Sequence, residues 1–190
     1  RPNIRTLFLV GSCPSEVIKL DLERAAQRLN QRWHPQVKVL NYSGSGIETT
    51  FTQGEDACLQ ALVPHLPLSA KAPAQLLVVG TVADVVEDQF SQLFKSMGLN
   101  NVAFFPPRRS AELPAIGPGT RFVLAQPFLS DTARALQAMG MECISAPFPL
   151  GVQGTTGWLK AIAHSFGIDE QRVESVIAAP KARALKALEA

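Results

Sequence analysis

Cys13 has the clearest potential for chemistry because of the residues on either side of it. The run from Thr6 to Val10 has the residue types of a buried strand, and Pro14 suits the first position of a helix because its missing N–H needs no partner there. We therefore expect Cys13 where the carboxyl end of a strand meets the amino end of a helix. Ligands of open α/β sheets bind at that edge, and a helix amino end favours a thiolate. Such a cysteine can be a nucleophile, a redox thiol or a metal ligand, or simply a small apolar filler.

A second candidate is the glycine-rich loop Ser43-Gly44-Ser45-Gly46, which follows the strand predicted at 37–42. Its glycines allow backbone amides to approach a phosphate, although the full G-x-G-x-x-G pattern and the Lys-Ser/Thr of a P-loop are missing. A plain turn at the edge of a sheet explains the same residues. Arg108 and Arg109 can clamp a carboxylate or a phosphate, or they can be a solvated pair that follows two prolines.

The remaining cysteines and the histidines suggest packing rather than chemistry. Cys58 falls on the apolar side of a helix predicted from about Gly54 to Val63, and Cys143 falls on a predicted strand. The three histidines have no ligand spacing. A cluster bound by cysteines usually needs about four ligands, so no local group of residues in this sequence can assemble a metal site alone.

Apolar periodicity predicts strands that alternate with helices. Strands are expected at 6–10, 37–42, 76–79, 102–105, 122–124 and 143–145. Helices are expected at 22–29, 54–63, 86–97 and 130–139, then one capped by Thr155 or Thr156 and one capped by Asp169, which Pro180 should kink or break. The alternation predicts an α/β fold of doubly wound parallel sheets in two Rossmann-like units.

Composition excludes several classes of function. The 190 residues are 46% hydrophobic and 18% charged with a net charge of +2, and no basic run favours nucleic acid. No apolar run approaches the roughly 18 residues that span a membrane. Three cysteines without short spacing indicate a reducing compartment rather than a disulfide framework. The apolar surplus suggests a subunit that hides some of its surface against a partner.

Four stretches resemble the catalytic subunits of the nitrogenase-like reductases. The first contains Cys13 in Phe-Leu-Val-Gly-Ser-Cys-Pro-Ser-Glu-Val-Ile, like the third-cysteine segment of these subunits. The longest, residues 40–54, is similar to the N-subunit family of light-independent (dark-operative) protochlorophyllide reductases. The other two stretches are 125–129 and 146–159. The resemblance extends over essentially all 190 residues.

The resemblance implies an oxidoreductase of chlorophyll biosynthesis. In that family, subunits N and B form a heterotetramer, and an L iron–sulfur protein delivers electrons with the use of ATP. A [4Fe-4S] cluster between N and B takes three cysteines from N and an aspartate from B, and passes electrons to the C17=C18 bond of ring D of protochlorophyllide. Cys13 matches the third cysteine and is the expected metal ligand. The setting would be the cytoplasm of a photosynthetic bacterium or the chloroplast stroma.

The same resemblance implies that the chain is a middle fragment. The first two cysteine ligands are expected upstream of Arg1, so the fragment alone should be inactive. We expect residues 1–66 to be the carboxyl-terminal part of a first α/β domain and 67–74, within a proline-bearing segment that begins at Pro64, to be a linker. Residues 75–168 would form a second Rossmann-like domain, and 169–190 a helix that leads toward a third.

The substrate is expected to contact the loop that follows the second strand. Gly44 and Gly46 leave room for a flat macrocycle, and Ile47 and Phe51 offer apolar contact. Three other interpretations stay open: a related tetrapyrrole reductase, a nucleotide- or phosphate-binding α/β domain without a metal, and a non-catalytic assembly module. The stretch 40–54 disfavours the first of these.

Overall fold

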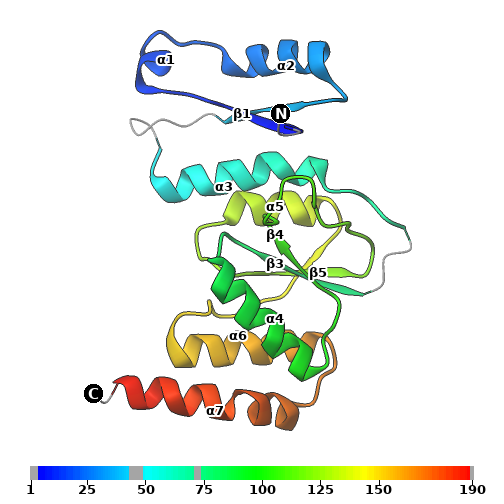
Figure 1. Ribbon diagram of the computed structural model, residues 1–190, viewed down its shortest axis with the longest axis vertical. Helices are drawn as coiled ribbons and strands as arrows, with labels where there is room; N and C mark the ends of the chain where they lie inside the picture. Colours follow the sequence, from blue (N-terminus) through cyan, green and yellow to red (C-terminus); the bar gives the residue numbers. More distant parts are fainter. Residues whose placement is uncertain (1–3, 43–48, 71–73, 189–190) are drawn as a thin grey trace.

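The computed structural model describes residues 4–42, 49–70 and 74–188, and it contains two parallel β-sheets (Figure 1). Strands β1 (Thr6–Val10) and β2 (Lys38–Tyr42) pair in the register Thr6 to Lys38. The second sheet has the order β4-β3-β5-β6. Its strands are β3 (Gln75–Val79), β4 (Val102–Phe105), β5 (Thr120–Leu124) and β6 (Glu142–Cys143). Parallel strands joined through helices confirm the predicted α/β fold.

Helices cover both faces of each sheet in the described chain (Figure 1). One layer packs on the β1–β2 sheet and consists of α1 (Cys13–Val17) and α2 (Leu22–Trp33). Between the two sheets lie α3 (Phe51–Leu62), the short 3-10 helix η1 (Val63–His65) and α5 (Ser130–Ala138). Beyond the second sheet lie α4 (Asp84–Met97), α6 (Gly151–Ser165) and α7 (Glu170–Leu188).

The second sheet forms the densest part of the core. Leu76, Leu77, Val78 and Val79 are completely buried, as expected for a parallel strand covered on both faces. Toward α4 and α6 the core is aromatic, with the ring of Trp158 at 4.9 Å from that of Phe90. The indole nitrogen of Trp158 donates a hydrogen bond to the Leu124 carbonyl at 3.0 Å. The largest side chain of the core is thus also hydrogen-bonded.

Helix α3 contacts both sheets and so belongs to neither alone. Leu59 of α3, together with Val63 and Leu66 after it, joins the core cluster of the second sheet, while the same helix packs against β2. The start of the predicted linker is also hydrogen-bonded to a later segment of the chain, because the Ile116 N–H donates to the Pro67 carbonyl at 2.8 Å. The division of the chain at 67–74 therefore stays a prediction.

Two helices begin earlier than the sequence pattern predicted. Helix α3 begins at Phe51 rather than at Gly54, because Thr50 accepts a hydrogen bond from Gln53 N–H and Gln53 caps the Thr50 amide in return. Helix α6 begins at Gly151, so the prediction that Thr155 or Thr156 caps it is wrong. Thr156 instead donates from within the helix to the Val152 carbonyl at 2.7 Å.

Glycines explain why α6 extends into a stretch of low helix propensity. A Cβ added at Gly154 would lie 2.4 Å from the Phe148 carbonyl oxygen, and one at Gly157 would lie 2.8 Å from Cγ of Pro147. Tertiary packing therefore requires glycine where propensity disfavours it. Asp169 caps the last helix as predicted, and α7 continues through Pro180 to Leu188, so Pro180 does not break the helix.

Candidate functional site

An apolar cleft of about 670 Å³ lies where the carboxyl ends of four strands meet. Val10 and Tyr42 end β1 and β2 on one side of the cleft, while Thr81 follows β3 and Pro106 and Pro107 follow β4 on the other. Crevices at the carboxyl ends of parallel strands are the usual ligand sites of open α/β sheets. Sheet topology alone therefore makes this cleft the candidate site.

The walls of the apolar cleft suit a hydrophobic ligand. Apolar side chains predominate among its lining residues, and Phe51 at the start of α3 has 88% of its surface exposed. The predicted contact residue Phe51 thus lies on the cleft. Gly44, Gly46 and Ile47, with the whole proposed phosphate loop 43–46, lie outside the described residues. The remaining apolar lining includes Phe8, Leu59, Leu62 and Leu113.

Tyr42 connects the floor of the cleft to α3. Its ring extends from the end of β2 to Gly54, where an added Cβ would lie 2.1 Å from the tyrosine hydroxyl oxygen. Glycine at position 54 therefore allows Tyr42 to lie against the helix. Sequence analysis missed Tyr42, although its place at the carboxyl end of a predicted strand was a usable signal.

Substituting Gly54 by alanine is expected to destabilise the protein by about 1–3 kcal/mol, because Tyr42 must leave its position. Thermal unfolding of the wild type and the variant measures the change. The same substitution is made in a Tyr42→Phe protein as the control, since phenylalanine lacks the hydroxyl oxygen that the new methyl group would meet. Gly54→Ala should cost much less in that background, and an equal loss in both would contradict the contact.

Glu55 and Cys58 are the titratable groups on the cleft wall contributed by α3. Glu55 Oε1 accepts a hydrogen bond from Thr81 N–H at 3.3 Å and so links α3 to the end of β3. Burial, and secondarily the charge of Glu55, raises the pKa of the Cys58 thiol. Cys58 lies half-buried on this wall rather than sealed in the core, and its raised pKa keeps it a thiol at neutral pH. Burial likewise raises the pKa of half-buried Cys143.

Cys13 differs from both, because its side chain is exposed. It is the first residue of α1, directly after the N-cap Ser12, so the helix begins one residue before the expected first residue Pro14. The chain reaches it at the carboxyl end of β1, where Gly11 N–H extends the sheet by donating to the Tyr42 carbonyl at 3.2 Å. Cys13 therefore shares a sheet edge with the cleft without lining it.

A metal cluster held by Cys13 needs ligands from elsewhere. No group of three or more His, Cys, Asp or Glu that could hold a metal ion occurs among the residues that the structure describes. An exposed cysteine at the amino end of a helix fits a ligand to a shared cluster, because the remaining ligands can approach it from outside.

Of the two interpretations of the arginine pair, a ligand clamp and a solvated pair, neither describes both residues, because each arginine pairs with carboxylates of this chain. Arg108 already forms ion pairs with the carboxylates of Asp84, Glu87 and Asp88, and its hydrogen bonds to Asp88 and Glu87 raise its pKa. Arg109 pairs with Glu112, with Nη1 to Oε1 at 3.4 Å. Arg108 thus fixes the segment after β4 to α4, which positions the prolines of the cleft.

Comparison with known proteins identifies the family. Residues 1–190 match the family described as nitrogenase component 1 type oxidoreductase. The chain belongs to this family. Membership of this nitrogenase component 1 type family confirms the resemblance stated from the four sequence stretches.

Named relatives make the assignment within the family more specific. The chain is 63% identical over 190 residues to light-independent protochlorophyllide reductase subunit N of Rhodopseudomonas palustris strain CGA009, and 68% identical over 189 residues to the subunit N of Bradyrhizobium sp. strain ORS 278. These alignments cover 100% and 99% of this chain but 44% of each relative. The chain thus spans less than half the length of the relatives that it matches.

A solved structure supports the fold of this nitrogenase component 1 type chain. The structure described as "Nitrogenase Cp1 at pH 6.5" superposes with a TM-score of 0.69 at 16% identity, over 86% of this chain and 41% of that one. At such low identity the likeness concerns the fold alone, and it agrees with the parallel sheets covered by helices. No helix in the described ranges combines the length and the apolar character needed to span a membrane.

Proposed function

We propose that this chain is the central part of subunit N of a light-independent protochlorophyllide reductase. The observation that carries the proposal is the 61–68% identity to proteins of that name along the entire chain. In the proposed reaction, the C17=C18 bond of protochlorophyllide ring D takes up two electrons and two protons. The electrons would come from an L iron–sulfur protein that uses ATP, through a [4Fe-4S] cluster shared with the sister subunit of the B type. The complex would work in the cytoplasm of a photosynthetic bacterium or in the chloroplast stroma.

The apolar cleft supports a flat, apolar substrate. Its volume of about 670 Å³ and its predominantly apolar lining suit a large ring system better than a phosphate. We propose that the pigment contacts Phe51 here, with Gly44, Gly46 and Ile47 completing the contact. Cys13, at the same sheet edge, is proposed to supply one cluster ligand.

Anaerobic co-purification of the intact N subunit with its sister subunit tests the proposed function. Iron analysis and the absorption change from protochlorophyllide to chlorophyllide, with the L protein and ATP present, are the two readouts. We expect iron bound to the complex and pigment reduction that depends on ATP. A complex without iron, or an iron-bearing complex that leaves the pigment unreduced, would overturn the proposal.

Replacing Phe51 by alanine in that complex is expected to weaken protochlorophyllide binding about tenfold. The exposed ring would be covered by the pigment, and an aromatic contact of this kind is worth about 1–2 kcal/mol. Fluorescence titration with the pigment measures the affinity, and the cluster absorption should be unchanged. Leu68→Ala is the matched control, since Leu68 is 75% exposed and lies outside the cleft. Equal weakening in both variants would count against a pigment contact at Phe51.

A further inference from the structure

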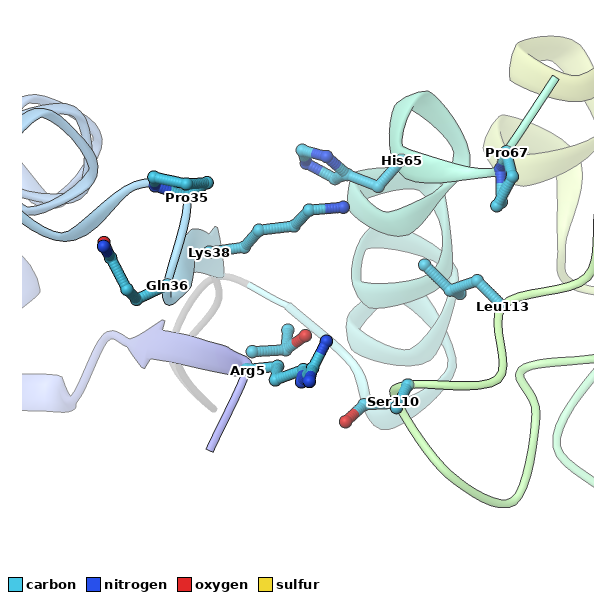
Figure 2. A pocket seen from close by; sticks show the side chains of 10 residues that line it. Arg5, Pro35, Gln36, Lys38, His65, Pro67, Ser110 and Leu113 are labelled. Atoms are coloured by element: carbon cyan, nitrogen blue, oxygen red, sulfur yellow. The ribbon is translucent and has the colours of Figure 1, made fainter. Parts of the chain in front are cut away.

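A second cavity, of about 480 Å³, lies at the opposite end of the β1–β2 sheet from the carboxyl edge. Figure 2 shows its side chains converging from four segments that are distant in the sequence. Arg5 precedes β1, Lys38 begins β2, His65 ends η1, and Ser110 belongs to the segment after β4. We call this the basic cavity.

The basic cavity gathers positive charge without a counter-charge. No aspartate or glutamate occurs among its described lining residues. Within the described chain, Arg5 and Lys38 form no ion pair, whereas the comparably exposed Arg121 pairs with Glu142. Lys38 is half-buried, and its ammonium points toward the His65 ring in Figure 2. A half-buried cation in a cavity without acidic residues is typical of a site that binds anions.

Backbone pairing brings the two permanent cations to the same edge of the sheet. The Lys38 N–H donates to the Arg5 carbonyl at 2.8 Å, so both side chains start from adjacent, hydrogen-bonded strands. The Ser110 hydroxyl adds a neutral donor to the same cavity, whereas the Gln36 amide points away from the two cationic groups in Figure 2. Neighbouring cations with a neutral donor beside them can recognise carboxylate and phosphate oxygens.

The protonation of His65 depends on the positive charges that surround it in the basic cavity. Burial lowers its pKa, and the positive charges of Lys38 and His34 lower it further. The charged groups that face His65 are Lys38 from β2, Arg5 before β1 and His34 from the end of α2, and all of them are cationic when protonated. An anion in the cavity would reverse this field and raise the pKa of His65.

We propose that the basic cavity binds a compact polyanion whose charge is carried by phosphate or carboxylate groups. The cavity exceeds the size of a single phosphate ion, so the ligand would bear at least two oxyanion groups. No phenylalanine, tyrosine or tryptophan occurs among the described lining residues, so a nucleobase would find no stacking surface. This site is separate from the proposed reductase reaction and does not depend on it.

Isothermal titration of the intact protein with pyrophosphate and, separately, with citrate tests the proposal at constant ionic strength. Saturable binding of pyrophosphate alone indicates a phosphorylated ligand, and binding of citrate alone a polycarboxylate. Lys38→Gln and Arg5→Gln should each weaken binding about tenfold, because each removes a charge-assisted hydrogen bond. Arg109→Gln removes an equal charge outside the cavity and should change the affinity less than about twofold.

The number of protons taken up on binding gives a second readout, which would not change if His65 had only a structural role. Because a bound anion raises the pKa of His65, the wild type should take up more protons on binding than His65→Gln does. Titrations in two buffers of different ionisation enthalpy measure the uptake for both proteins, and the difference between them removes the protons that the probe itself exchanges. Circular dichroism checks the fold of the variant. No saturable binding of either probe, or equal weakening by Lys38→Gln and Arg109→Gln, would overturn the proposal.

Discussion

Cys13→Ser in the intact N–B complex is expected to remove most of the iron and visible absorption of its cluster, and with them pigment reduction. Even changes in residues that only support metal ligands lower affinity or activity about 10–100-fold, so the loss of a ligand should exceed that range. Cys13 is the cysteine among the described residues that is both exposed and placed at a strand-to-helix junction.

Cys58→Ser is the matched control for this prediction. Cys58 is half-buried, and burial raises its pKa, so it is a poor source of thiolate. Its replacement should leave the iron content and the cluster spectrum unchanged. If both variants lose iron to the same extent, or if Cys13→Ser keeps its cluster, then Cys13 is not the ligand.

Asp56→Ala is expected to be the most destabilising of the substitutions considered, by about 3 kcal/mol, which corresponds to a fall of about 6–12 °C in the midpoint of thermal unfolding. Helix α5 has Leu129 at its N-cap and therefore lacks a capping side chain of its own. Asp56 of α3 supplies the cap from outside: its carboxylate accepts from Asp131 N–H at 2.9 Å and from Thr132 N–H at 2.8 Å. The Thr132 hydroxyl donates to it as well, at 2.6 Å.

The loss of stability expected for Asp56→Ala is large because the carboxylate and its hydrogen-bond donors are buried. Asp56 is 5% exposed and Thr132 is completely buried, so alanine would leave buried donors without a partner. Asp21→Ala is the comparison, since Asp21 caps α2 at an exposed position with one bond of 2.9 Å to Arg24 N–H. That change should cost about 1 kcal/mol. Equal losses for Asp21 and Asp56 would contradict the bridging role.

Local sequence signals predicted the ends of helices well where a residue type is suited to one particular position, such as glycine after a helix or proline at its start. Gly98 was expected to end α4, and it does so with a φ of 94°, which a residue with a side chain rarely adopts. Pro14 was expected at the first helical position and is found one residue later, as the second residue of α1. The start of α3 was missed even though Thr50 and Gln53 have the spacing of a capping box.

The features that escaped prediction depend on residues far apart in the sequence. Asp56 and Thr132 are 76 positions apart, and nothing near either residue indicates the other. The glycines at the start of α6 look like a loop until Phe148 and Pro147 are seen against them. The apolar cleft likewise exists because α3 packs on both sheets, a matter of tertiary packing that periodicity does not encode.

The apolar cleft and the basic cavity have three lining residues in common. Thr6, Ser110 and Leu113 line both hollows, so the two hollows adjoin. A substitution at any of these three residues therefore alters the lining of both hollows at once, and variants meant to test one hollow alone must avoid them.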